Sequence, residues 1–234
     1  MSRMKTLGMI GGLGPESTIE YYRAIIAAHQ ERTRDGSLPS LLISSIDVTT
    51  VLALAADKKL EELANLMVNE LEKLARGGAE VAMIASNTPH LVFNAVRERS
   101  PLPLVSIVEA TCAEAKRRGL TKLALLGTRF TMQSRFYAEV FDAQGVALVV
   151  PPNADLDYVH EKYIGELLKG VILPETRAGL LDVIARLKQR EKIDGVILGG
   201  TELSLILSDG MDAEIPFLDT MRIHVRAAID RLAE

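Results

Sequence analysis

The stretch LGMIGGLGPEST, residues 7–18, joins a short apolar run to a glycine-rich turn that is followed by Pro15. The apolar run predicts a buried strand, and proline is favoured in the first turn of a helix. Gly11, Gly12 and Gly14 predict a tight strand-to-helix turn, because glycine allows positive φ and close backbone approach. Such a turn aims N–H groups at an anion. Its spacing is neither G-x-G-x-x-G nor a Walker loop, so a small carboxylate is as good a ligand as a phosphate.

The rest of the chain alternates short apolar runs with helical patterns. Apolar strands between helices are typical of a parallel α/β sheet that is buried on both faces. The patterns predict strands at residues 6–12, 41–48, 80–86, 122–128, 145–152 and 194–202. They predict helices at residues 17–33, 59–78, 89–100, 107–119, 174–191 and 220–234.

The chain also repeats itself. Residues 7–22 can be laid on residues 123–137 at an offset of 116, and residues 81–90 on residues 195–204 at an offset of 114. Two matches at nearly equal offsets predict two similar α/β lobes. Their Gly- and Thr-rich loops, at the carboxyl ends of the strands, are expected to line a central cleft. We expect the first lobe to comprise residues 1–98 plus 210–234, and the second residues 99–209.

Composition excludes several classes of protein. The net charge is −4, Trp is absent, and no basic stripe is seen, so neither nucleic acid nor an anionic membrane is an expected partner. No apolar run approaches the roughly 20 residues of a membrane span, and residues 1–12 read as a strand rather than a signal peptide. The single cysteine, Cys112, excludes an intrachain disulfide and a cysteine-based zinc site, and reads as a small buried residue. A cytoplasmic location is expected.

Four motifs resemble, in order, those of the aspartate/glutamate racemase family, whose members work without pyridoxal phosphate. They are GMIGGLGPEST with the following YY (residues 8–22), SNTPH (86–90), GGTEL (199–203) and IPFLDTMRIHVRAA (215–228). The resemblance implies two similar α/β lobes with the active site between them, a homodimer, and no cofactor or metal. It also implies one cysteine from each lobe: one thiolate takes the α-proton of an amino acid, and the other thiol delivers a proton to the opposite face.

The sequence departs from that pattern at both cysteines. Ser86 stands where the family typically has the cysteine of Cys-Asn-Thr-x-His, and Gly200 where it has the cysteine of Gly-Cys-Thr-Glu. A thiol titrates near 8.5, whereas a serine hydroxyl needs an adjacent base. Loss of a positioned proton-transfer group costs about 10²–10⁴-fold in rate. Efficient two-base racemisation is therefore not expected.

The resemblance also implies the site. Ser86 and the Gly200 position would face the α-carbon from opposite sides. The expected ligand is an acidic amino acid or dicarboxylate, bound by Gly12, Asn87, Thr88, Thr128, Thr131, Thr201 and Glu202. Each has an alternative role in turns and caps, and the two hydroxyls of the GTRFT segment would equally well satisfy their own backbone. His90 is a candidate to orient or deprotonate Ser86, or to pack in the core.

The leading interpretation is a cofactor-independent amino-acid racemase of the aspartate/glutamate type, catalysing 1,1-proton transfer at the α-carbon, whose activity is impaired by the loss of both thiols. Three alternatives remain open. They are a non-catalytic binder of a small carboxylate, a related lyase or decarboxylase, and a chain whose cysteines were removed by design.

Overall fold

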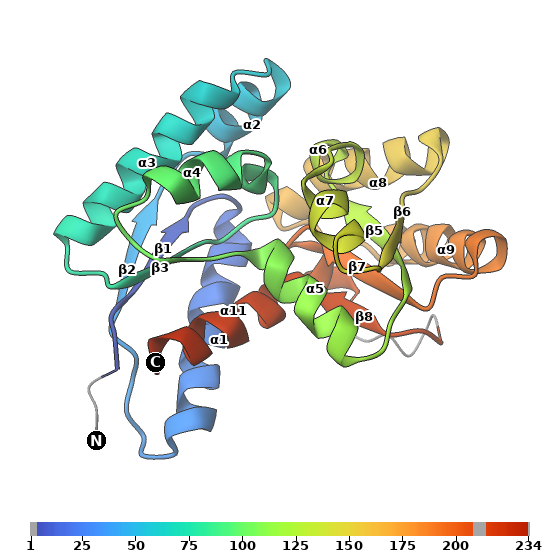
Figure 1. Ribbon diagram of the computed structural model, residues 1–234. Helices are drawn as coiled ribbons and strands as arrows, with labels where there is room; N and C mark the ends of the chain where they lie inside the picture. Colours follow the sequence, from blue (N-terminus) through green and yellow to red (C-terminus); the bar gives the residue numbers. More distant parts are fainter. Residues whose placement is uncertain (1–3, 208–213, 234) are drawn as a thin grey trace. The chain divides into compact units, whose positions relative to one another are not determined.

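The computed structural model describes residues 4–207 and 214–233, which form two compact units (Figure 1). The first unit is residues 1–107 together with 221–234, and the second is residues 108–220. Among the described residues, no helix is both long enough and apolar enough to cross a membrane.

The first unit is built on a four-stranded parallel sheet of order β2-β1-β3-β4. Its strands are β1 (Leu7–Gly11), β2 (Leu41–Ser45), β3 (Val81–Ile84) and β4 (Leu104–Val105). Its helices are α1 (Pro15–Thr33), α2 (Val48–Ala56), α3 (Leu60–Arg76), α4 (Phe93–Arg99) and α11 (Thr220–Leu232), with a 3₁₀ turn η1 (Thr88–Val92) before α4.

Successive side chains of the central strands enter two different cores, because a strand points its residues alternately to the two faces of the sheet. Ile10 packs with α2, α3 and α4 on one face, whereas Met9 packs with α1 and α11 on the other. In Figure 1, α11 lies beside α1, and Arg32 of α1 pairs with Asp230 of α11 at 2.5 Å. Burial on both faces explains why these strands read as continuous apolar runs.

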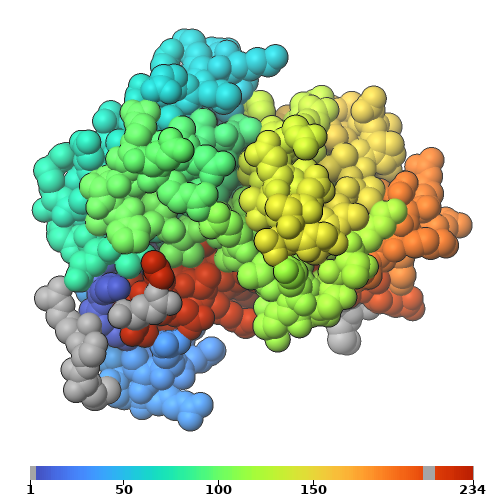
Figure 2. All heavy atoms as spheres, in the orientation of Figure 1, coloured from blue at the N-terminus to red at the C-terminus, as the bar shows by residue number. Residues whose placement is uncertain are grey.

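The second unit repeats this plan with a parallel sheet of order β6-β5-β7-β8. Its strands are β5 (Lys122–Gly127), β6 (Ala147–Val149), β7 (Gly195–Gly199) and β8 (Phe217–Asp219). Its helical segments are α5 (Ile107–Arg117), α6 (Arg129–Gln133), α7 (Phe136–Asp142), α8 (Asn153–Gly165), η2 (Leu167–Lys169), α9 (Pro174–Glu191) and α10 (Leu203–Ile206). In Figure 2 the cyan to green of the segment that includes α2, α3 and α4 covers much of the visible face of the first unit, and the yellow-green to yellow of α7 and α8 much of that of the second.

The equal strand orders confirm the two similar α/β halves that the repeat predicted. The repeat extends to a side chain that ties neighbouring strands together. In the first unit Glu80 accepts a hydrogen bond from the backbone N–H of Thr6 at 2.8 Å. In the second, Asp194, which lies 114 residues after Glu80, accepts from the N–H groups of Thr121 and Lys122 at 2.7 and 3.1 Å. A carboxylate before each central strand therefore satisfies the amides at the start of its neighbour.

The unit boundaries differ from those expected at residues 98/99 and 210. Residues 99–107 belong to the first unit because β4 pairs with β3, and the chain returns to that unit only after Thr220 because β8 pairs with β7. The expected return point at residue 210 itself lies outside the described residues. Pairing of these two short edge strands, and not a break in composition, sets the division.

Candidate functional site

The Ser86 loop, residues 85–88, follows the central strand β3 of the first unit. The backbone N–H of Ser86 turns back to the carbonyl of Ile84 at 2.8 Å, and Asn87 then occupies the cap position of η1. Pro89 lies in the first turn, where its missing N–H is not needed. Ser86 is 8% exposed, and Asn87 and Thr88 are buried. The loop thus places three polar residues at the carboxyl end of a central parallel strand, which is where open α/β sheets bind ligands.

His90 fixes the backbone of this loop. Its Nδ1 donates to the carbonyl of Ser86 at 2.9 Å, and its Nε2 accepts from the N–H of Ile107 at 3.2 Å. Burial lowers the pKa of His90 to about 3, so the ring is neutral. Within residues 4–107 and 221–233, no group hydrogen-bonds the Oγ of Ser86. His90 therefore holds the main chain of the loop and is not the base that would activate the Ser86 hydroxyl.

Gly12 lies at the carboxyl end of β1, the strand that pairs with β3. Its φ is +77°, and a Cβ at this position would lie 2.2 Å from the carbonyl oxygen of Ile46. Its N–H donates to the Oγ1 of Thr18 at 2.9 Å, and that hydroxyl donates in turn to the carbonyl of Gly14. Backbone packing alone therefore requires a glycine here.

The Gly200 loop, residues 199–202, follows β7 at the equivalent place in the second unit. Thr201 and Glu202 are buried, and the Oγ1 of Thr201 donates to the Oε2 of Glu202 at 2.9 Å. The hydroxyl of Tyr163, on α8, donates to the same carboxylate oxygen. The carboxylate of Glu202 thus gathers two hydroxyl groups beneath the Gly200 loop.

Tyr163 also covers the α-carbon of Gly200. A Cβ at residue 200 would lie 2.3 Å from the Cε2 and 2.9 Å from the Cζ of the Tyr163 ring. Burial raises the pKa of the Tyr163 hydroxyl well above its ordinary value of 10, and the nearby Glu202 carboxylate raises it further. The phenol is therefore neutral. Sequence reasoning missed Tyr163, which is 39 residues from Glu202 and matches none of the four motifs.

Thr128 and Thr131 lie after β5, the strand that pairs with β7. Thr128 caps α6: its Oγ1 accepts from the N–H of Thr131 at 3.2 Å and lies 3.1 Å from that residue's Oγ1. Thr131 is fully buried. This geometry matches the alternative in which the two hydroxyls satisfy their own segment.

The expected site residues therefore form two sets, one in each unit. Gly12, Ser86, Asn87 and Thr88 gather at the ends of β1 and β3, and Thr128, Thr131, Gly200, Thr201 and Glu202 at the ends of β5 and β7. In the described ranges, 4–207 and 214–233, no group of three or more His, Cys, Asp or Glu side chains could hold a metal ion.

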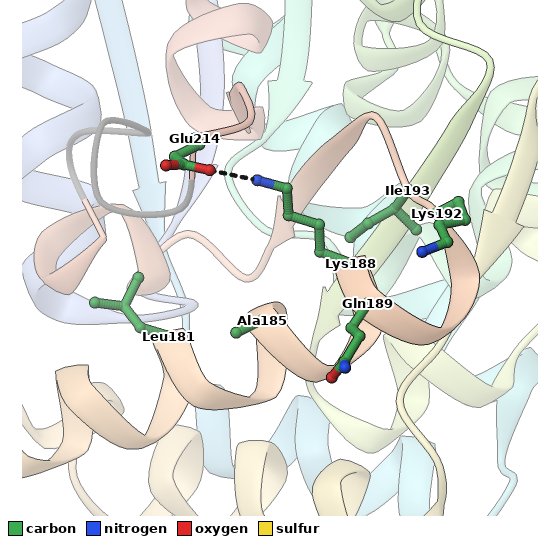
Figure 3. Close-up of a pocket in the computed structure, with 7 residues that line it drawn as sticks. All are labelled: Leu181, Ala185, Lys188, Gln189, Lys192, Ile193 and Glu214. Atoms are coloured by element: carbon green, nitrogen blue, oxygen red, sulfur yellow. Dashed lines mark hydrogen bonds and ion pairs between the residues drawn. The ribbon is translucent and has the colours of Figure 1, made fainter.

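A surface depression of about 620 Å³ lies elsewhere, along the C-terminal part of α9 (Figure 3). In Figure 3 the Nζ of Lys188 reaches across to Glu214, with which it forms a 3.1 Å ion pair. None of the expected site residues lines this depression. Its lining consists of three aliphatic residues, two lysines, Gln189 and Glu214.

Comparisons with known proteins show the family and the fold. The family model of Asp/Glu/Hydantoin racemase matches residues 10–228. The chain is 23% identical to the broad specificity amino-acid racemase RacX of Bacillus subtilis (strain 168), over 92% of each protein. It superposes on a putative Asp/Glu racemase from Yersinia pestis with a TM-score of 0.89 and 33% identity, over 99% of this chain and 100% of that one. It superposes on an aspartate racemase homologue from Pyrococcus horikoshii OT3 with a TM-score of 0.85 and 34% identity, again over 99% of this chain and 100% of that one. The chain belongs to the Asp/Glu/hydantoin racemase family.

Proposed function

We propose that this protein binds a small acidic amino acid or dicarboxylate and is a cofactor-independent racemase-type enzyme in which two-base proton transfer at the α-carbon is impaired. The proposed binding residues are Gly12, Asn87, Thr88, Thr128, Thr131, Thr201 and Glu202. We further propose that it works as a cytoplasmic homodimer, for which light scattering of the purified protein is the test.

One observation carries this proposal. The two central strands, β3 and β7, end in equivalent loops that begin with Ser86 and Gly200 and continue into buried polar residues. The resemblance to the family implies a proton-transferring cysteine at each of these two positions. The shared strand order and the two matched polar loops support the proposal that these loops derive from a pair that transferred protons at the two faces of one carbon atom.

The impairment follows from the groups present. Among the residues that the structure describes in the first unit, no base is hydrogen-bonded to the hydroxyl of Ser86, and Gly200 has no side chain at all. The phenol of Tyr163 is neutral because burial raises its pKa, and both ring nitrogens of His90 are already bonded to backbone groups, so neither side chain supplies a base. Losing one positioned proton-transfer group costs about 10²–10⁴-fold in rate, so turnover far below that of a two-thiol enzyme is expected.

Exchange of the α-proton in D₂O tests the proposal. The protein is incubated with L- and D-aspartate and with L- and D-glutamate. The Cα–H signal is then followed by NMR, while chiral chromatography follows the enantiomers. Slow exchange above a protein-free control, lost in Ser86→Ala, is expected. Absence of exchange together with a rise in Tm on adding the amino acids would indicate the binder instead. Release of CO₂ from a malonate without racemisation would indicate the decarboxylase.

A further inference from the structure

The environment of Gly200 differs from that of an ordinary turn glycine. The glycine is buried, and the nearest atoms to a Cβ at this position are all in the ring of Tyr163, at 2.3, 2.9 and 3.1 Å. Real Cβ contacts essentially never fall below 3.0 Å. A side chain at residue 200 and the phenol in its present place therefore exclude each other.

The ring of Tyr163 is also firmly held. Tyr163 is 5% exposed and packs in the core of the second unit with Leu156 and Val159 of its own helix. Its hydroxyl donates to Glu202, which is fully buried and also receives the hydroxyl of Thr201. Moving the ring away would remove one of the two hydroxyl groups that donate to this buried carboxyl group, and losing a buried hydrogen bond is costly.

We infer that Tyr163 and Gly200 form one interdependent unit, in which the phenol ring occupies the volume of a side chain at residue 200. Tyr163 is thereby a specificity-determining residue of the second half of the site: its ring, fixed on Glu202, stands where the resemblance to the family implies a thiol, and it prevents a thiol at residue 200 from working. The functional part of this inference rests on the proposed function, whereas the steric part does not.

A double-mutant cycle tests the steric part without any assay of activity. Gly200→Ala is expected to lower the apparent Tm by roughly 3–10 °C, as for an overpacked core. The same substitution in a Tyr163→Ala background should lower it by much less, because the ring is gone. An equal loss of Tm from Gly200→Ala in both backgrounds would overturn the inference.

A second glycine–tyrosine pair supplies a matched control. A Cβ at Gly179 of α9 would lie 2.0 Å from the hydroxyl of Tyr158, one helical turn and a half before Tyr163 on α8. Tyr158 is only half-buried, so the far end of its side chain can swing aside. Gly179→Ala should therefore leave the Tm unchanged or raise it, since alanine is the better helix former.

Restoring the thiols tests the functional part. In the Ser86→Cys background, Gly200→Cys alone is expected to give no gain in α-proton exchange. Adding Tyr163→Ala should raise exchange by 100-fold or more, whereas adding Tyr163→Phe, which keeps the ring, should not. Measurable exchange that is equal with and without Tyr163→Ala would overturn the functional part of the inference. If the stability cycle shows coupling and no variant exchanges, the steric pair stands and the proposed function fails.

Discussion

The imidazole rings of His90 and His224 meet edge to face inside the first unit, with their centroids 6.2 Å apart. Each ring nitrogen has one partner, which fixes both tautomers. For His90, Nδ1 donates to the carbonyl of Ser86 (2.9 Å) and Nε2 accepts from the N–H of Ile107 (3.2 Å). For His224, Nε2 donates to the carbonyl of Val105 (2.9 Å) and Nδ1 accepts from the hydroxyl of Tyr21 (3.1 Å). The pair ties the Ser86 loop to the residues at which the chain leaves and re-enters the first unit.

Acid is expected to destabilise the protein through this pair. Burial lowers the pKa of His90 to about 3 and that of His224 to about 4, from an ordinary value of 6.5. Between pH 6.5 and pH 4 the unfolded chain therefore binds protons that the folded chain does not, so stability is complete above pH 6.5 and falls as the pH drops. Each histidine should contribute about 1.4 kcal/mol per pH unit. Urea unfolding at pH 7.5, 6.0 and 5.0 measures the slope.

The carboxylates provide a check on that assignment. The hydrogen bond from Arg117 helps to lower the pKa of Glu114 to about 2. Glu114 therefore adds stability that is lost only below about pH 4.5. Measurements above pH 5 thus separate the histidines from such groups. His224→Gln should be less stable at pH 7.5 and should show a smaller pH slope, of which the remainder comes from His90 and from His160, whose pKa burial also lowers. A stability that does not change between pH 7.5 and 5.0 would contradict the neutral pair.

Gly12→Ala should lower the free energy of unfolding by much more than Gly36→Ala. The two glycines have nearly the same φ, +77° and +76°, but a Cβ at Gly12 would strike the backbone of Ile46, whereas nothing lies within 4 Å of one at Gly36. The strain of positive φ alone is expected to cost about 1 kcal/mol, and the clash at Gly12 should add at least as much. Urea denaturation of both variants gives the comparison, and equal losses would show that the close approach is easily relieved.

Thr128→Val should destabilise the protein by about 1 kcal/mol, because it removes the hydroxyl that caps α6. Thr128→Ser keeps that hydroxyl and should be nearly as stable as the parent. Chemical denaturation of both variants, each with and without added aspartate, measures the two effects. A Thr128→Val variant of full stability that no longer responds to aspartate would assign the hydroxyl to the ligand rather than to the cap.

Cys112 should be a slow, non-catalytic thiol. It is 2% exposed, its Sγ lies 3.9 Å from the carbonyl of Val140, and burial raises the pKa of the thiol. It borders a surface depression of about 450 Å³ on the second unit, yet little of the sulfur is open to a reagent. Because thiolates are the reactive form, Ellman's reagent should label the native protein many times more slowly than the urea-unfolded protein. Rapid native labelling that abolishes α-proton exchange would make Cys112 part of the site.

Local pattern predicted most of the fold. Strands β1, β3, β5 and β7 and helices α1, α3, α5, α9 and α11 lie within or close to the predicted ranges, because strand and helix periods are written in neighbouring residues. Helix α2 was missed, since its β-branched start reads as a continuation of β2. Its signal was Asp47, which caps it by accepting from the N–H of Thr49 at 2.9 Å. Helix α8 was missed as well, although Leu156, Val159 and Tyr163 recur at helical spacing.

The sequence by itself determined the two-fold repeat, the polar loops after β3 and β7, and the absence of cysteine from both, because each can be read from the order of residues along the chain. Only the tertiary structure decided what surrounds those loops. It placed Tyr163 over Gly200, engaged both nitrogens of His90 with backbone, and joined β4 and β8 to their sheets. Except for the bond between His90 and the Ser86 carbonyl, these contacts join residues that are far apart in the chain. All of them depend on volume and hydrogen-bond geometry in space, which a one-dimensional pattern does not specify.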